Sequence, residues 1–442
     1  MSTILLFGAG KSTTSLIDYL GKTCEENNWK IFVCDADISL AQSKTNQFSC
    51  AEAISFDVTN PEKRHKFISQ ADIVISMLPP SLHFLVAKDC LAFSKNLLTA
   101  SYIDTNIRSL SDEIEAKGLL FIGEMGLDPG IDHMSAMKMI NEIKSKGGTI
   151  TSFKSHCGGL MSPESDDNPW HYKISWNPIN VVAAGSSGAF YKEKGEIKEV
   201  LYSHIFEDEG HIVDVPGIGT LAWYANRDSL SYIDTYNLHG VHTFLRTTLR
   251  YPAFCRGWNK VVHLDLTNKN DHEEIKHCKT FADWFELKKQ KLINQQEKNF
   301  DENDFFNAEF VQQLDFLSIR SDEKLPEPVP NSASLLQYLL EKNLVMKPTD
   351  QDMIIMLHEI KFSVEGKDKE TRSCLIVKGE DKTHTAMAKT VGLPLGIAAM
   401  LILKNKINVK GLHIPVIPEI YEPVLAGLEL NGIKFKEETI DL

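Results

Sequence analysis

The chain opens on a short apolar run that stops at two glycines. Residues 4–7 read ILLF, Gly8 and Gly10 follow with one alanine between them, and an amphipathic stretch covers 12–20. A strand, a glycine turn and a helix start in this order let the backbone approach a pyrophosphate, whose charge the helix N-terminus favours. The opening therefore predicts a parallel α/β unit that binds a dinucleotide.

A nucleotide-triphosphate P-loop would also place a glycine before Lys11 and Ser12. Its pattern GxxxxGK[ST] needs the first glycine at Leu5, which lies inside the predicted strand. This excludes the P-loop. The third glycine of GxGxxG is replaced by Thr13, so the dinucleotide assignment also depends on the residues that follow.

The next 120 residues alternate between strand and helix patterns. Six apolar strands separated by helices indicate a doubly wound parallel sheet, in which a ligand lies across the carboxyl ends of the strands. A nucleotide-sugar domain, or a Rossmann domain without cofactor, stays open as an alternative. The predicted strands are 4–7, 30–34, 53–58, 71–78, 96–103 and 119–123, and the predicted helices include 61–69, 81–93 and 107–117.

An acidic residue at the end of the second strand bears on the choice of cofactor. Asp35 stands where a carboxylate accepts hydrogen bonds from a ribose 2′-hydroxyl and repels a 2′-phosphate. No basic residue follows it before Lys44. Alternatively, Asp35 or Asp37 caps the next helix. We predict NAD as the cofactor, with NADP still possible.

Composition limits the partners and the compartment. The chain has 442 residues, enough for two or three domains, and a net charge of −13, which argues against nucleic acid and anionic membranes. The longest apolar run, 392–403, is too short to span a bilayer, and with the first strand at the N-terminus we expect no signal peptide. Eight dispersed cysteines predict neither a metal site nor disulfides, as suits a reducing cytoplasm.

Beyond residue 131 the pattern changes to a mixed sheet with a helical insertion. A helix is predicted at 131–146, followed by strands at 149–156, 172–176, 181–182, 197–201 and 262–266. The helical insertion is predicted to contain helices at 281–293 and 333–344. A hairpin from 352–362 and 371–377 follows, and a last helix at 384–403 is expected to pack on the nucleotide unit. The predicted division is a Rossmann domain at 1–130 and about 385–442, a mixed α/β substrate and dimerisation domain at 131–267 and 350–384, and a helical insertion at 268–349.

Three segments concentrate polar residues and glycines. The first, 123–133, follows the sixth strand and reads as a turn plus a helix cap, or as part of a site at the sheet edge. The second, 155–176, is predicted to be a glycine-kinked loop. The third, 224–251, carries arginines that are either ordinary surface residues or anchors for substrate carboxylates. These arginines are Arg227, Arg246 and Arg250.

These segments resemble saccharopine dehydrogenases of the L-glutamate-forming type, also called saccharopine reductases. The resemblance runs from residue 4 to about residue 436, and family members are typically homodimers with the three-part architecture above. The most specific segments are GLDPGIDHM (126–134), SHCGGLMSPESDDNPWHYKISW (155–176), NRDS (226–229), TTLRY (247–251) and AKTVGLPLGIAA (388–399).

The resemblance implies a substrate, saccharopine, and a set of contacts. Saccharopine is a secondary amine that joins the ε-nitrogen of lysine to glutamate, and its oxidation with NAD(P) releases L-glutamate and 2-aminoadipate 6-semialdehyde. The implied substrate contacts are Ser101, Tyr102, Asp128, Arg227, Thr248, Leu249 and Arg250. The predicted cofactor contacts are Gly8, Gly10, Lys11, Ser12, Asp35, Asp57, Val58, Met77, Thr99, Ala100, Leu127, Asp128, Pro129, Gly130 and Ser175.

Proton handling is assigned to Asp128, Tyr102 and Cys157, with His133 and His156 nearby in sequence. We expect no single essential base: Asp128 orients the amine and Tyr102 orients water. Cys157 reads equally well as a buried thiol.

The sequence departs from the family at three places. NADP-using members carry a basic residue at the position of Asp35, Ala100 replaces a serine, and the loop after Gly159 is altered. A related carboxyamine- or polyamine-forming dehydrogenase, or a non-catalytic dinucleotide sensor, stays open as an alternative.

Overall fold

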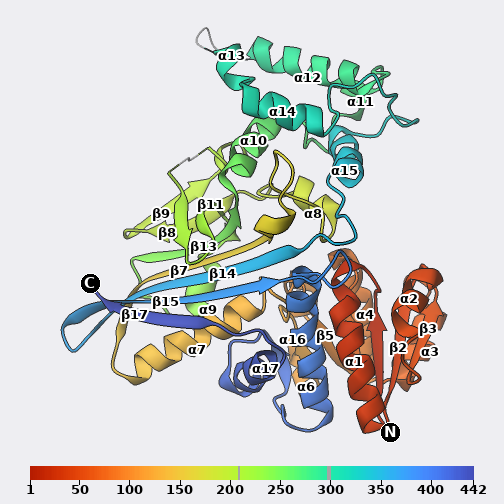
Figure 1. The fold of residues 1–442 in the computed structure, drawn as a ribbon. Coiled ribbons are helices and arrows are strands. Elements are labelled where there is room, and N and C mark those ends of the chain that lie inside the picture. The colour runs from red at the N-terminus through yellow and green to blue at the C-terminus, as the bar shows by residue number, and fades with distance from the viewer. Residues whose placement is uncertain (208–209, 296–299) are drawn as a thin grey trace.

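Two β-sheets organise the chain. The computed structural model describes residues 1–207, 210–295 and 300–442. A parallel sheet lies with the N-terminus at the lower right of Figure 1, and a larger mixed sheet crosses the middle of the view. Helices between residues 272 and 343 lie beyond the mixed sheet, at the top. The protein is therefore an α/β chain with a helical insertion.

Seven strands form the parallel sheet: β1 Thr3–Phe7, β2 Lys30–Asp35, β3 Ala51–Ser55, β4 Ile73–Ser76, β5 Asn96–Thr99, β6 Leu120–Ile122 and β16 Gly411–His413. Their order is β16-β6-β5-β4-β1-β2-β3, and all neighbouring pairs are parallel. Residues 4–7 of β1 are fully buried, as expected for a strand covered on both faces. This confirms the predicted doubly wound sheet.

The helices of this unit are α1 Thr14–Asn27, α2 Ile38–Thr45, α3 Pro61–Gln70, α4 Pro80–Ala92, α5 Thr105–Arg108 and α6 Ser111–Ala116. Local caps define where they begin. The Asp37 carboxylate accepts hydrogen bonds from the first turn of α2, and the Asn60 side chain does the same for α3. The predicted single helix at 107–117 is split, because the chain turns between Arg108 and Ser111.

Two C-terminal helices return to the parallel sheet: α16 Ala386–Leu403, which contacts α1, and α17 Pro418–Leu430, which contacts α16. Among the described residues, α16 is the single helix long and apolar enough to cross a membrane by length and composition. Because 72% of it is buried inside the protein, its apolar character is explained by packing in the core. The predicted packing of this helix on the nucleotide unit is confirmed.

Ten strands form the mixed sheet: β7 Thr149–Met161, β8 Ala189–Glu193, β9 Glu196–Val200, β10 Ile212–Val215, β11 Gly219–Ala225, β12 Arg227–Asp228, β13 Thr243–Arg250, β14 Asp352–Val364, β15 Lys367–Lys378 and β17 Lys436–Asp441. The main path is β10-β11-β13-β7-β14-β15-β17, and β13 runs parallel to β7. The predicted hairpin of β14 and β15 and the predicted strands at 149–156 and 197–201 are confirmed. Three helices accompany this sheet: α7 Ile131–Ser145, α8 Pro178–Val182 and α9 Ser231–Thr235.

Four predictions in this region are wrong. Residues 172–176 form no strand, and residues 181–182 lie in α8. Residues 262–266 lie at and beyond the end of a helix, whose buried face includes Trp258 and Val261 at helical spacing. Residues 155–161 continue β7 instead of starting a loop, because both glycines of this stretch pair with β14. The apolar composition of these short runs did not distinguish strand from helix.

The division of the chain differs at its C-terminal end. The predicted Rossmann segment, 385–442, includes β17, but β17 pairs with β15 in the mixed sheet. The final strand thus ties the end of the chain to the second sheet. The other boundaries stay predictions.

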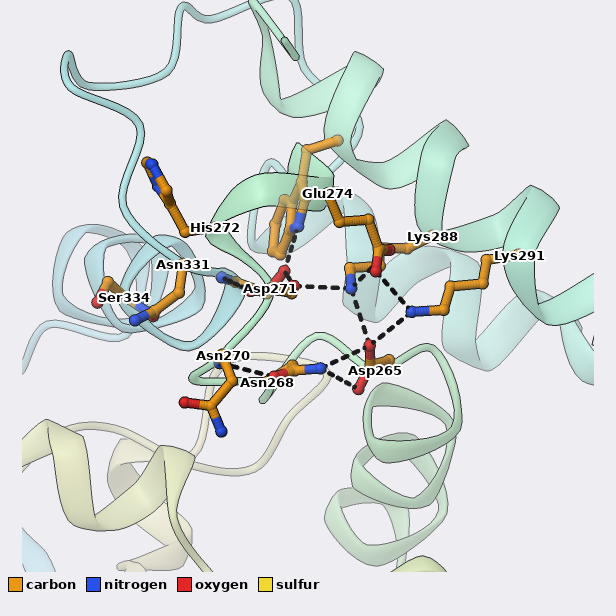
Figure 2. Close-up of polar contacts among 12 residues, drawn as sticks. Asp265, Asn268, Asn270, Asp271, His272, Glu274, Lys288, Lys291, Asn331 and Ser334 are labelled. Carbon is orange, nitrogen blue, oxygen red and sulfur yellow. Dashed lines mark hydrogen bonds and ion pairs between the residues drawn. The ribbon is translucent and has the colours of Figure 1, made fainter. Parts of the chain in front are cut away.

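After β13 comes α10 Pro252–His263, and the helical insertion contains α11 His272–Ile275, α12 Phe281–Gln295, α13 Glu302–Phe305, α14 Ala308–Phe316 and α15 Ser332–Asn343. A fully buried lysine, Lys288, lies inside it (Figure 2). Its ammonium group is 2.8 Å from Asp265, 2.7 Å from Asp271 and 3.2 Å from Glu274. Burial works to lower the pKa of Lys288, but hydrogen bonds to Asp265 and Asp271 outweigh it and raise the pKa, so the group stays charged.

Candidate functional site

A cavity of about 860 Å³ lies at the carboxyl ends of the parallel strands, where the mixed sheet faces them. Its floor comes from the glycine turn after β1 and from the segments that follow β4, β5 and β6. Its other wall comes from β7, β11 and β13 and from the residues around α8. A ligand in this cavity would lie at the carboxyl ends of the parallel strands, as the fold class predicts, and would also contact the mixed sheet.

The glycine turn is shaped to bring backbone close to a ligand. Gly8 has φ of +99°, and a Cβ there would lie 2.8 Å from the carbonyl oxygen of Met77, so a larger residue does not fit. A Cβ at Gly10 would meet no protein atom within 4 Å, because this glycine faces the cavity. The turn therefore fits the pyrophosphate of a dinucleotide.

Asp35 and Asp37 have separate roles. Asp37 caps α2, whereas the Asp35 carboxylate accepts hydrogen bonds from the N–H groups of Ala9, at 2.7 Å, and of Asp37, at 2.9 Å. Asp35 thus lies against the glycine turn at the end of β2. Lys44 also reaches the turn, with Nζ 2.6 Å from the carbonyl oxygen of Gly10, and burial lowers its pKa to about 8.

A buried chain of hydroxyl groups and imidazole lies between α4 and the end of β5. His83 Nδ1 is 2.8 Å from Ser76 Oγ, and its Nε2 is 2.8 Å from Ser101 Oγ. Burial lowers the pKa of His83 to about 4, so the ring is neutral at pH 7. Ser101 lines the cavity, and its hydroxyl group is held by the hydrogen bond to the neutral imidazole, whose tautomer decides which group donates.

The turn after β6 places Asp128 at the cavity. Gly130 has φ of +148°, and a Cβ there would lie 2.1 Å from the carbonyl oxygen of Gly126. The N–H of Gly130 donates to Asp132 Oδ1 at 2.6 Å. Close backbone packing and a hydrogen bond to the first turn of α7 therefore fix the shape of this turn. Asp128 lies on the side of the turn that lines the cavity.

Behind Asp128 lies a buried polar cluster. Arg246 Nη2 is 2.5 Å from Asp128 Oδ1 and 2.7 Å from Asp132 Oδ2. His133 joins the cluster on α7: its Nε2 is 2.9 Å from Glu124 Oε2 and its Nδ1 is 2.5 Å from the hydroxyl of Tyr236. Each sheet thus supplies members of this cluster.

Two other arginines have no carboxylate partner among the residues that the structure describes. Arg250 is 5% exposed, and its donor contacts are backbone carbonyls, Leu249 O at 2.8 Å and Gly159 O at 3.5 Å. Its guanidinium lies over the ring of Tyr172 at 5.3 Å. Arg227 has φ of +51° and lies over the ring of Tyr102 at 5.4 Å. Both line the cavity; Arg250 is buried there, whereas Arg227 is exposed and lies within electrostatic reach of Asp128.

Tyr102 and Cys157 also line the cavity, and both are protonated at neutral pH. Burial raises the pKa of the Tyr102 hydroxyl, against a lowering by Arg246. Burial also raises the pKa of the Cys157 thiol, and the neighbouring carboxylates add to the rise. Asp128 differs, because burial, opposed by Arg246 and supported by Asp132, raises its pKa only to about 6. Among these three, Asp128 is the group that is ionised at pH 7.

The structure brings most predicted site residues to one cavity. Those that line it are Gly10, Lys11, Ser12, Met77, Ala100, Ser101, Tyr102, Leu127, Asp128, Pro129, Cys157, Arg227, Thr248 and Arg250. Others lie outside its lining: Gly8, Asp35 and Gly130 support the turns, and Thr99 and Leu249 are buried. Asp57 is exposed, Val58 is buried, and the Ser175 side chain hydrogen-bonds Asp352.

Several residues of the site were not predicted. His83 follows the Pro79-Pro80 pair at a helix start on the ligand-binding edge, which was an available signal. Trp176 and Tyr224 line the cavity from segments whose secondary structure was not predicted correctly. Asp132 and Glu124 lie in the polar segment 123–133, but their partners could not be predicted, because Arg246 and Tyr232 lie more than a hundred residues away.

The fold and the site together define a dinucleotide-binding α/β protein whose cavity is lined by Arg227 and Arg250. Family models agree: the saccharopine dehydrogenase NADP binding domain matches residues 4–122, and the saccharopine dehydrogenase C-terminal domain matches 126–433. The chain belongs to the saccharopine dehydrogenase family.

Individual relatives cover the chain from end to end. It is 31% identical to saccharopine dehydrogenase [NADP(+), L-glutamate-forming] of Schizosaccharomyces pombe, with 100% of both chains covered. It is 32% identical to alpha-aminoadipic semialdehyde synthase of Arabidopsis thaliana, over 99% of this chain and 45% of the relative. The chain thus spans about half the length of the aminoadipic semialdehyde synthases that it matches. The solved apo saccharopine dehydrogenase (L-Glu forming) of Saccharomyces cerevisiae superimposes with a TM-score of 0.86 at 29% identity, covering 100% of both chains.

Proposed function

We propose that this chain oxidises saccharopine with a nicotinamide dinucleotide, forming L-glutamate and 2-aminoadipate 6-semialdehyde. The glycine turn and Lys11 would hold the pyrophosphate of a dinucleotide, and this cofactor would supply the hydride acceptor. The hydride leaves the ε-carbon of the lysine part of saccharopine, and the amine nitrogen loses a proton as the C=N bond forms. Water then adds to this imine, and the C–N bond breaks to release glutamate and the aldehyde.

The observation that supports this proposal most strongly is the environment of Arg250, which is buried at the cavity without a carboxylate partner among the described residues. A buried guanidinium without a carboxylate partner is costly unless a ligand supplies the anion. Saccharopine has three carboxylates, and Arg227 offers a second cation at the same cavity. Arg246 is the contrast within the chain, because its charge is balanced by two aspartates.

The polar residues of the cavity have complementary roles in this proposal. Asp128, ionised at neutral pH, orients the secondary amine without acting as a single essential base. The Tyr102 hydroxyl and Ser101, the latter fixed by His83, orient the attacking water. Cys157 stays a neutral thiol that fills the wall of the cavity. The glycine turn and Lys11 hold the pyrophosphate side of the cofactor.

A direct assay tests the proposal. We expect saccharopine-dependent absorbance at 340 nm with NAD or NADP, and equal amounts of glutamate and semialdehyde as products. Lysine plus glutamate at the same concentrations serves as the control and should give no signal. Absence of saccharopine-dependent reduction with either cofactor, in protein that binds the dinucleotide, would contradict the proposal.

Cofactor preference follows from Asp35. Because its carboxylate lies against the glycine turn, a 2′-phosphate would meet a negative charge, and we expect NAD to be favoured at least tenfold in kcat/KM, about 1.4 kcal/mol. Asp35→Arg should shift the preference toward NADP, whereas Asp37→Asn, which changes the helix cap, should leave it unchanged. Faster turnover of the native protein with NADP at equal low concentrations would refute this assignment.

We also propose a cytoplasmic homodimer. The family resemblance supports the dimer, and eight cysteines that are all free support a reducing compartment. Sedimentation equilibrium of the purified chain tests the first part, and a mass near 50 kDa would exclude it.

A further inference from the structure

Asp128 is one of three charged groups that meet behind the cavity wall. Resting on the proposed function, we propose that Arg246 and Asp132 are a positioning pair that holds the Asp128 carboxylate toward the substrate amine and sets its charge. Asp128 lines the cavity, whereas neither partner does. Arg246 and Asp132 therefore act through Asp128 and not by contact with the substrate.

The pair is rigidly built. Arg246 is 2% exposed and lies on β13, where its backbone N–H donates to Ser229 Oγ at 3.0 Å. Its guanidinium lies 4.6 Å from the ring centre of Tyr232. Asp132 is 1% exposed and is held by the N–H of Gly130. A single nitrogen of Arg246 contacts both carboxylates, so the two aspartates share one positive charge.

Because Asp128 and Asp132 share one cation, Arg246 and Asp132 have opposite effects on the pKa of Asp128. The Arg246 guanidinium lowers the pKa of Asp128, and the Asp132 carboxylate raises it. The other groups that face Asp128 are His133 on α7, Arg227 on β12, Tyr102 beyond β5, Cys157 on β7 and Tyr236, whose pKa burial raises. Of these, His133 is paired with Glu124, and Tyr102 and Cys157 are uncharged at neutral pH.

Two substitutions should therefore move the titration of Asp128 in opposite directions. In Arg246→Met, the midpoint should rise by at least one pH unit, and the acidic limb of kcat/KM should rise with it. In Asp132→Asn, which keeps the acceptor for Gly130, the midpoint should fall by about one unit. Arg246→Lys should restore most of the wild-type midpoint. A purely structural role would lower stability without producing shifts of opposite sign.

The measurement is infrared titration of carboxyl groups in the apo protein, taken as the difference from the same protein carrying Asp128→Asn. The titration needs no turnover, so its result is independent of the saccharopine assay. Failure of the positioning proposal is therefore distinguishable from failure of the proposed reaction. In addition, the single variant Arg246→Met should have a kcat at least tenfold below that of the wild type. In a protein that already carries Asp128→Asn, adding Arg246→Met should lower kcat less than threefold. Should Arg246→Met not fold, Asp132→Asn decides: a lower midpoint supports the proposal, and an unchanged or higher one overturns it.

Discussion

Lys288→Met should lower the free energy of unfolding by about 3–5 kcal/mol. The substitution removes the cation shared by Asp265, Asp271 and Glu274 and leaves buried carboxylate in the helical insertion. Asp271 is the critical partner, because its side chain is 2% exposed and also receives hydrogen bonds from Ser332. Urea unfolding followed by tryptophan fluorescence measures the effect.

Lys291→Met is the matched control on the same helix. Lys291 contacts Asp265 and Glu274, but its side chain is 34% exposed, so water screens the pair and the cost should be about 0–1 kcal/mol. Equal losses from the two substitutions would mean that burial does not determine the importance of this cluster.

Arg250→Ala should cost about 2–4 kcal/mol of transition-state binding, or about 30- to 1000-fold in kcat/KM for saccharopine. The substitution removes the buried cation that we assign to a substrate carboxylate, while the dinucleotide-binding turn lies on the other sheet. Fluorescence titration should therefore give an unchanged dissociation constant for NAD. Arg320→Ala, which removes an exposed pair with Asp315, should change neither quantity.

Equal losses of saccharopine turnover and NAD affinity in Arg250→Ala would reassign Arg250 to the cofactor or to folding. Circular dichroism of the variant separates these two readings.

Much of the fold was predictable because its signals are local. The buried parallel strands are continuous apolar runs, and the turn between β14 and β15 falls at Glu365 and Gly366, both with positive φ. β13 was missed because it carries Arg246 and Arg250, which are unusual in a central strand. β16 was missed because it has three residues and depends on pairing with β6. These elements are fixed by tertiary contacts, which a local pattern does not record.

The residues of the candidate site were largely predictable, but the contacts between them were not. Arginine among threonines indicated anion binding, but whether an arginine faces a ligand or an internal carboxylate depends on the partners that folding supplies. Arg246 meets Asp128 and Asp132 across more than a hundred residues, whereas Arg250 meets no carboxylate in the part of the chain that the structure describes. Strand alternation explains Leu249, whose side chain is fully buried between the cavity-lining Thr248 and Arg250.

The most direct test of the central claim pairs the arginine with the carboxylate. Three saccharopine analogues, each lacking one carboxylate, are compared with saccharopine on the wild-type protein and on Arg250→Ala. We predict that one analogue loses about 30- to 1000-fold in kcat/KM on the wild type but less than about threefold on the variant, because the charge pair is already absent. Equal losses on both proteins for all three analogues would contradict the claim that Arg250 binds a substrate carboxylate.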